Sequence, residues 1–390
     1  MAVAPPLPQS GLDFGLSEEQ EILRREVRRF AEERIRPGAA ARDAERRFPA
    51  EIVSEMGALG LLGMLVDEEY GGAGFDALSY VVAVEELARV CPATAGTMSV
   101  TNSVCCWPIG HFGSEGLKRR ILPELASGRV LGGFGLTEPE AGSDAGSLKT
   151  RAERAGDSWV LDGEKAWITN AGVASWFVVM ARTDPGAEKG GITAFVVAAD
   201  SPGLQIGSPE AKMGLRAAKT APLLFNRCKV PAENQLGELG AGFKIALATL
   251  DHSRLGIAAQ AVGIHQRALE LAVAYSRERV QFGKPIAQHQ AIRFKIAQMA
   301  TELEAARVLT RSAAVSTTRA SAGRLASQAK LFASEAANRA CYESLQIHGG
   351  NGFSDEYEIS KLYRDVRVTA IYEGTSEMQR WVISRQLLRD

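Results

Sequence analysis

The chain has 390 residues, of which 45 are basic and 46 acidic, so its formal net charge is −1. This length predicts about two to three domains, and a hydrophobic content of 46% is typical of globular proteins. The near-zero net charge implies no broad electrostatic field for nucleic acid or a membrane surface. No apolar run approaches the ~20 residues needed to cross a bilayer. We therefore expect no nucleic acid and no membrane among the partners.

The five cysteines are scattered and form no CxxC pair, and the five histidines form no HExxH motif. This pattern predicts neither a disulfide framework nor a metal site, and it fits a reducing compartment. The Pro-rich segment Met1–Gly11 lacks the basic and apolar order of a signal peptide, and no transit peptide is evident. We expect a cytoplasmic protein.

The first 130 residues predict a helical domain. Ser17 followed by Gln20 is a capping-box pattern, and apolar residues then recur at helical spacing. Pro37 and Gly38 are expected to end this first helix. Further helices are predicted at 49–59, 77–90 and 114–127.

Short β-type runs between Gly, Pro and Asp turns begin at about residue 131. They predict an antiparallel β-domain over 131–238, either a barrel or a sandwich. Within it, Asp162-Gly163 is expected to be the two-residue turn of a hairpin between 159–161 and 164–169. Residues two apart in a strand share a face, so Trp167 and Thr169 are expected to point the same way. That pair suits a flat heteroaromatic cofactor, although a half-buried core Trp explains it equally well.

The segment 239–390 is helical again, in long pieces. Helices are predicted at about 241–277, 287–316, 322–347 and 374–388. Four long helices joined by short links favour an antiparallel bundle. The predicted order along the chain is therefore helical, β, helical.

Glu373 is the candidate catalytic residue, in the stretch Ile371-Tyr372-Glu373-Gly374-Thr375. Apolar neighbours disfavour a charged carboxylate and raise its pKa towards neutrality. A base works best with a pKa near the working pH, and Gly374 allows a ligand to approach the backbone. On these residues alone, a solvated carboxylate at the start of a helix is the simpler alternative.

Four further stretches are candidate binding sites, each with a simpler alternative. The loop 134–144 offers backbone N–H groups and hydroxyls, but it is neither a Walker loop nor GxGxxG and is often only a polar loop. Asp251 and Arg254 are neighbours on a helix and hold either a ligand or a salt bridge. The basic break 277–285 suits a phosphate or a solvated turn. The glycine cluster in 346–353 suits a close cofactor or a helix C-cap.

Together and in this order, five motifs resemble the acyl-CoA dehydrogenase family over essentially the whole chain, from about Leu16 to Leu388. The motifs are Thr137-Glu138-Pro139-x-Ala141-Gly142-Ser143-Asp144, Trp167-Ile168-Thr169-Asn170, Arg279-x-x-Phe282-Gly283, Gln346-x-x-Gly349-Gly350 and Ile371-Tyr372-Glu373-Gly374-Thr375. The resemblance implies an α+β multi-domain fold with a helical N-terminal domain, a middle antiparallel β-barrel and a C-terminal four-helix bundle. It also implies non-covalent FAD and a homotetramer.

The resemblance implies a set of FAD-binding residues, with the adenine and pyrophosphate end held partly by a neighbouring subunit. The set is Phe134, Leu136, Thr137, Gly142, Ser143, Trp167, Ile168, Thr169, Arg279, Phe282, Gln290, Gln346, Ile347, Gly349, Gly350, Thr375, Ser376 and Glu377. For the acyl-CoA it implies contacts with Ser143, Asp251, Arg254, Tyr372 and Gly374. No metal is implied.

The implied reaction is α,β-dehydrogenation of a short- to medium-chain acyl-CoA to a trans-2-enoyl-CoA. Glu373 removes the α proton, the β hydrogen leaves as hydride to FAD, and an electron-transferring flavoprotein takes the electrons. One branch of the family has its base at the position of Ser253, which cannot fill that role here. The stretch 250–263 resembles the short-chain members.

Two alternatives remain at this stage. One is an oxygen-using acyl-CoA oxidase, for which the chain is shorter than usual. The other is a flavin-binding, nucleic-acid-associated relative with little dehydrogenase activity. Such relatives carry an extra basic C-terminal domain, whereas this chain ends at Asp390 with a net charge near zero.

Overall fold

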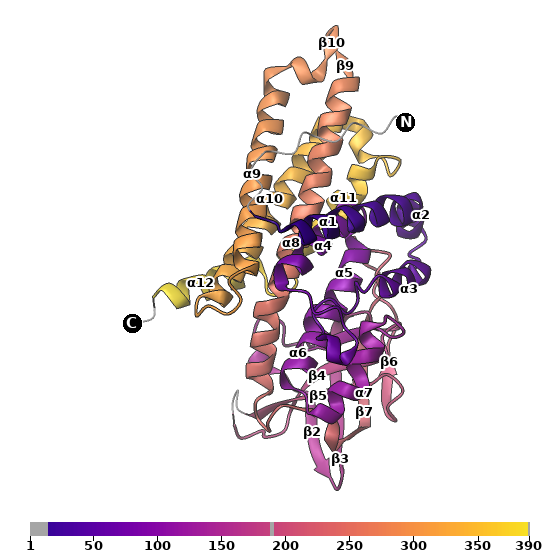
Figure 1. The fold of residues 1–390 in the computed structure, drawn as a ribbon, viewed down its shortest axis with the longest axis vertical. Coiled ribbons are helices and arrows are strands. Elements are labelled where there is room, and N and C mark those ends of the chain that lie inside the picture. Colours follow the sequence, from indigo (N-terminus) through magenta and orange to yellow (C-terminus); the bar gives the residue numbers. More distant parts are fainter. Residues whose placement is uncertain (1–14, 188–190, 389–390) are drawn as a thin grey trace.

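The computed structural model describes residues 15–187 and 191–388, and these follow the predicted helical, β, helical order (Figure 1). The strands lie at one end of the long axis, and a hairpin between two long helices lies at the other. The domain division at 1–130, 131–238 and 239–390 stays a prediction, and its outermost residues (1–14 and 389–390) lie outside the described part of the chain. The predicted absence of a leader in Met1–Gly11 also lies outside it.

In the described residues, seven α-helices precede the strands. They are α1 (Glu18–Phe30), α2 (Arg36–Ala44), α3 (Ala50–Ala58), α4 (Ala77–Ala88), α5 (Pro92–Val100), α6 (Trp107–Phe112) and α7 (Glu115–Ala126). The Ser17 and Gln20 capping box is confirmed, because each side chain accepts from the other's backbone N–H. The predicted helices at 49–59, 77–90 and 114–127 correspond to α3, α4 and α7. Helices α5 and α6 were not predicted, since every residue of α5 is buried and no polar face marks it.

The expectation that Pro37 and Gly38 end the first helix is wrong. A π-helical segment, Ala31–Ile35, joins α1 to α2, and Pro37 lies in the first turn of α2. There Pro37 lacks only an N–H that the first turn of a helix leaves without an intrahelical partner. The wider π turn thus carries the helical path past the proline.

The described residues in the middle of the chain form one eight-stranded sheet. Its strands are β1 (Gly132–Gly135), β2 (Arg151–Ala155), β3 (Ser158–Thr169), β4 (Trp176–Arg182), β5 (Ile192–Ala198), β6 (Leu204–Ile206), β7 (Thr220–Pro231) and β8 (Gln235–Leu236). The order is β6-β7-β3-β2-β4-β5-β8, with β1 beside β4. Most pairs are antiparallel as predicted, but β1 and β2 pair with β4 in parallel. The domain is therefore a mixed sheet, and the fully antiparallel prediction is wrong for these two pairs.

The predicted hairpin turn at Asp162-Gly163 is also wrong. β3 runs unbroken through these residues, and its register against β7 shifts there by a bulge. Asp162 accepts a hydrogen bond from the Arg227 backbone N–H at 2.7 Å. The turn lies instead between β2 and β3, where Gly156 has φ 60°. An Asp-Gly pair suits a bulge as well as a turn, because both need a residue without a side-chain clash.

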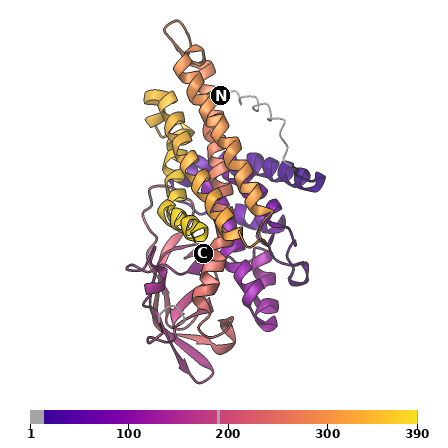
Figure 2. The same ribbon diagram turned by 90° about the vertical axis from the view of Figure 1, so that its left-hand side faces the viewer.

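The C-terminal part is built on three long helices, α8 (Gly242–Glu278), α9 (Gln290–Ala314) and α10 (Ala322–His348). A small hairpin, β9 (Val280–Gln281) and β10 (Lys284–Pro285), joins α8 to α9 at one end of the molecule (Figures 1 and 2). α12 (Ser376–Leu387) packs on α10 and completes the predicted set of four, while α11 (Glu358–Val366) was not predicted. The larger apolar core runs without a break from the N-terminal helices through β3 and β7 into α8 and α10.

No described helix is both long and apolar enough to cross a bilayer.

Candidate active site

Glu373 lies in the short connection between a 3₁₀ turn, Arg367–Ala370, and α12. Its φ is 55° and that of Gly374 is 88°, so two successive residues are left-handed. Thr375 then caps α12 by accepting from the Met378 backbone N–H at 3.3 Å. A left-handed Glu is costly and persists only where its surroundings fix it. The alternative of a carboxylate near a helix start is thus correct in position but not in solvation.

The Glu373 carboxylate faces α8 across a short gap and is half-buried in the protein alone. Ser253 donates its hydroxyl hydrogen bond to Glu373 Oε2 at 2.5 Å. Burial raises the pKa of Glu373 above its usual value, while the Ser253 hydrogen bond and the charges of Arg254 and Lys330 partly oppose that rise in pKa. The predicted direction of the pKa shift is confirmed.

Two buried side chains converge on the carbonyl next to the base. Lys330 Nζ donates to the Gly374 oxygen at 2.7 Å, and Gln379 Nε2 donates to the same oxygen at 2.8 Å. Gln379 Nε2 also lies 3.2 Å from the backbone carbonyl oxygen of Glu373. Neither residue is predicted from the sequence. A lysine within the buried small-residue face of α10 is the signal that would have pointed to Lys330.

Asp251 and Arg254 form the ion pair that their spacing predicts. Arg254 is buried and its Nη1 also lies 3.3 Å from the Ser327 hydroxyl, whereas Asp251 is half-exposed. The Gly374 Cα is so close to this group that a Cβ there would lie 3.9 Å from Arg254 Nη2. The structure therefore brings the predicted acyl-CoA contacts Asp251, Arg254 and Gly374 together around Glu373.

Tyr372 points away from this cluster into the interior. Its hydroxyl donates to Gln260 Oε1, and Gln260 Nε2 donates to the Pro92 oxygen at 2.8 Å. Nearby in the core, the Tyr80 hydroxyl lies 2.7 Å from that of Ser99. These hydrogen-bonded side chains occupy the space between α4, α5 and α8 beside the base. Gln260 was also missed, because nothing in its sequence neighbourhood marks it.

A buried ion pair holds the predicted flavin loop, residues 134–144, on its protein side. Lys165 Nζ lies 2.7 Å from Glu138 Oε1 and donates to the Leu136 oxygen at 3.2 Å. Glu138 also accepts from the backbone N–H groups of the two residues before β2. The predicted flavin-binding residues of this loop differ in burial: Leu136 is buried, Phe134 and Thr137 are half-buried, and Gly142 and Ser143 are exposed.

Trp167 fits a cofactor site better than the core. It is 61% exposed with φ 62°, at the second register shift of β3. Ile168 is 2% exposed, so only its backbone can face a ligand, and Thr169 is half-buried. An exposed indole beside a loop rich in backbone N–H groups is an unusual surface for a protein alone, and it suits the face and edge of a flavin ring.

The remaining predicted cofactor residues gather at the β9–β10 end. Arg279, Phe282, Ile347, Gly349 and Gly350 line a cavity of about 490 Å³. Phe282 is 94% exposed, and a Cβ at either glycine would meet no atom within 4 Å. This cradle is open to a ligand, and Arg279 offers it a guanidinium that can bind phosphate. Gln290 and Gln346 are exposed but lie outside the cavity lining.

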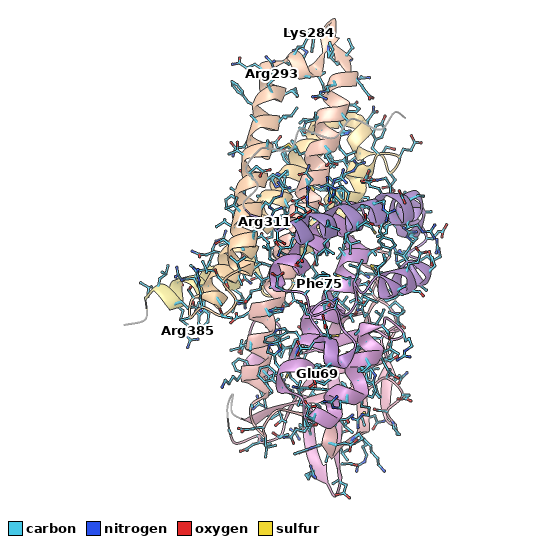
Figure 3. The ribbon with its side chains drawn as sticks, viewed as in Figure 1. Glu69, Phe75, Lys284, Arg293, Arg311 and Arg385 are labelled. Carbon is cyan, nitrogen blue, oxygen red and sulfur yellow. The ribbon has the colours of Figure 1, made fainter. Side chains whose placement is uncertain are left out.

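Within one protomer, the cavity at the β9–β10 end lies far from Glu373 along α8. Ser253, which contacts Glu373, precedes Arg279 on α8 by about 26 residues, which corresponds to about 39 Å of helix. In Figure 3, Lys284 marks the β9–β10 end of the molecule. Thr375 and Ser376 lie with Glu373, and Glu377 is exposed in the first turn of α12.

The described residues contain no group of three or more His, Cys, Asp or Glu side chains placed to hold a metal ion. The five cysteines are buried and unpaired.

Comparison with known proteins decides the family. The models of the N-terminal, middle and C-terminal domains of acyl-CoA dehydrogenases match residues 17–129, 133–228 and 240–388. The human mitochondrial short-chain specific acyl-CoA dehydrogenase is 49% identical over 96% of this chain and 91% of its own length. The chain belongs to the acyl-CoA dehydrogenase family. The predicted family, fold order and enzyme class are thereby confirmed.

Solved structures give the same result. The butyryl-CoA dehydrogenase of Megasphaera elsdenii superposes with a TM-score of 0.94 at 44% identity, covering 97% of this chain and 100% of that one. A chain from a structure of the electron transferring flavoprotein of Acidaminococcus fermentans gives 0.95 at 43% identity, with the same coverage. A glutaryl-CoA dehydrogenase of Mycobacterium smegmatis, solved with FADH2, gives 0.92 at 33% identity, covering 97% and 96%. The predicted FAD dependence is confirmed at the level of the family.

Proposed function

We propose that this acyl-CoA dehydrogenase oxidises short-chain acyl-CoA thioesters with Glu373 as the base. The observation that carries this proposal is the Glu373 carboxylate, held in a left-handed turn with a raised pKa. A carboxylate of this kind stays basic enough at neutral pH to remove a carbon-bound proton. It lies among the predicted acyl-CoA contacts rather than in solvent.

The residues around Glu373 suit proton abstraction next to a thioester carbonyl. The Glu373 backbone N–H donates no hydrogen bond to the described residues, so it is available to that carbonyl. A hydrogen bond there stabilises the negative charge that develops as the α proton leaves. Arg254 and Asp251 orient the CoA side. The chemistry that bound FAD supplies is acceptance of the β hydrogen as hydride.

The preference for short chains rests on the packing beside the base. Tyr372 donates to Gln260, and Gln260 donates to the Pro92 carbonyl. We infer that an acyl chain extends from the base towards these polar groups. A longer apolar chain would have to displace buried hydrogen bonds, which is costly. The human relative is named as short-chain specific, and the Megasphaera structure as a butyryl-CoA dehydrogenase.

A second copy of the chain is part of the proposal. Within one protomer, the cavity lined by Arg279 lies about 39 Å along α8 from Ser253, which contacts Glu373, and this distance supports a second copy at that end of the cofactor. We infer that Arg279 and its cavity serve the flavin end of a neighbouring subunit, in a homotetramer. An electron-transferring flavoprotein is the proposed electron acceptor, and a cytoplasmic location stays a prediction.

The decisive test is an anaerobic titration of the purified protein with butyryl-, isobutyryl-, 2-methylbutyryl-, octanoyl- and glutaryl-CoA. Bleaching of the yellow flavin by the four-carbon thioesters is expected. Glu373→Gln should keep FAD and bind acyl-CoA, but reduce the flavin at least about 10³-fold more slowly, because general base catalysis is worth 10²–10⁴. Ser143→Ala serves as a matched binding variant that leaves the base intact. Fast reduction by Glu373→Gln would show that the base is another group.

A further inference from the structure

Lys330 is a buried lysine that the reaction, as described so far, does not use. It lies on α10 with 0% of its surface exposed, and no described carboxylate forms an ion pair with it. Within the described part of the chain, it donates one hydrogen bond, to the Gly374 oxygen at 2.7 Å. Burying an ammonium without an ion-pair partner is expensive. A residue kept at that cost beside an active site is a candidate for a role in it.

The bond that Lys330 makes lies one residue from the base. Because Gln379 donates to the same oxygen, two buried donors fix the carbonyl that ends the left-handed turn. A Cβ at Gly374 would lie 2.7 Å from Gln379 Nε2, so the turn and its donors fit closely. The direction of the Glu373 side chain follows from this turn.

The charge of Lys330 also acts on Glu373. The titratable and charged groups that face the Glu373 carboxylate come from three other elements and from its own connection. They are Tyr80 on α4, Arg254 with its partner Asp251 on α8, Lys330 on α10, and Tyr372 next in sequence. Since Asp251 offsets the charge of Arg254, Lys330 is the cation without an ion-pair partner among them.

We propose that Lys330 is a positioning residue for the base: its ammonium holds the Gly374 carbonyl that fixes the Glu373 turn, and its charge keeps the Glu373 carboxylate ionised. The proposal rests on the proposed function, since it assigns a role relative to Glu373. Gln379 also holds the Gly374 carbonyl, but it has no charge and so cannot keep the Glu373 carboxylate ionised. Comparing variants of Lys330 and Gln379 therefore distinguishes the effect of the turn geometry on Glu373 from the effect of the charge.

The sign of the charge effect follows from the two pKa values. Glu373 acts only when ionised, and a nearby positive charge favours the ionised form. Burial lowers the pKa of Lys330 to about 8, so Lys330 is charged throughout the lower pH range in which Glu373 loses its proton. Removing that charge raises the pKa of Glu373, and the acid limb of kcat/KM moves to higher pH.

The experiment compares Lys330→Met, Gln379→Met and the control Lys212→Met in the FAD-loaded enzyme. Lys212 Nζ donates to the Ala218 oxygen at 2.7 Å, so its loss removes a similar bond away from the base. Lys330→Met should lower kcat about 10- to 100-fold and move the acid limb up by about 0.5 pH unit or more. Gln379→Met should lower kcat without moving the limb, and Lys212→Met should change neither.

A second readout isolates proton removal from oxidation. Acetyl-CoA has no β carbon and cannot be dehydrogenated, but its α protons can exchange with D2O. Mass spectrometry of acetyl-CoA incubated with each enzyme should show exchange with wild type and slower exchange with Lys330→Met, with the same upward shift in pH. Glu373→Gln should show none.

The outcomes distinguish this inference from the proposed function. An acid limb that does not move in Lys330→Met, with kcat near that of wild type, overturns the role of Lys330 while leaving Glu373 as the base. Unimpaired exchange in Glu373→Gln overturns the proposed function instead. If Lys330→Met does not retain FAD, Lys330→Gln is measured by both readouts. It keeps an amide donor but no charge, and an unmoved limb in it overturns the electrostatic role.

Discussion

Glu373 gives the clearest pH dependence at the scale of single residues. Because burial raises the pKa of Glu373, the carboxylate remains protonated at pH values where an exposed glutamate is already ionised. We expect kcat/KM to fall as the pH drops through this raised pKa, at a pH above the ordinary carboxylate value of 4.5. A pH profile of kcat/KM for butyryl-CoA checks this. A limb at or below that value would contradict a desolvated base.

Gln260 is the residue at which acyl-chain length can be tested. Gln260→Ala removes the bridge between Tyr372 and the Pro92 carbonyl and opens space beside the base. We expect the ratio of kcat/KM for octanoyl-CoA to that for butyryl-CoA to rise about tenfold or more, since one methylene in an apolar pocket is worth about 1–3 kcal/mol. Gln266→Ala is the matched control on the same helix, because Gln266 bonds to Arg307 and Glu270 rather than to the site. An unchanged ratio would place the end of the acyl chain elsewhere.

Individual elements show what the sequence could predict. Strong local signals, such as the Ser17 capping box and the long apolar periodicities of α8 to α10, gave correct helices. Asp162-Gly163 misled because the same residue pair serves a turn or a bulge, and strand pairing with β7 decides between them. In the site, the motif around Glu373 was predictable. The contacts of Lys330 with Gly374 and of Gln260 with Tyr372 and Pro92 join residues far apart in the sequence, which no local pattern records.

The bulge in β3 requires a residue without a side chain at Gly163, and this requirement can be tested. The φ of Gly163 is 143°, and a Cβ there would lie 2.7 Å from the Thr150 Cα. Gly163→Ala should lower the free energy of unfolding by about 2–4 kcal/mol, from backbone strain and overpacking together. Gly156→Ala, in the open β2–β3 turn with φ 60°, should cost only about 1–2 kcal/mol. Urea unfolding measures both, and equal losses would mean that crowding at the bulge is unimportant.

At the scale of the whole molecule, the order of domains followed from the change of sequence texture at about residues 131 and 239. The separation of the predicted FAD residues into two groups did not follow from the sequence, because it depends on the length of α8 in the folded chain. Under the proposed assembly, the residues beside Glu373 and the cavity lined by Arg279 at the β9–β10 end are two half-sites of different cofactor sites. Under that proposal, cofactor retention is coupled to assembly.

Arg279 tests that coupling. Arg279→Ala removes a guanidinium from the cavity at the β9–β10 end, so FAD retention should fall even though Glu373, Trp167 and the flavin loop are unchanged. We expect at least about a tenfold weaker FAD affinity, the loss of one charged hydrogen bond of about 1.5–3 kcal/mol, measured as flavin content after dialysis. Lys284→Ala, in the same hairpin but outside the cavity, should retain FAD (Figure 3). Dilution to monomers should also release FAD from the wild-type enzyme if the cavity serves a neighbouring subunit. If the wild-type monomer keeps its FAD, and Arg279→Ala also keeps FAD, then the two half-sites do not share one cofactor.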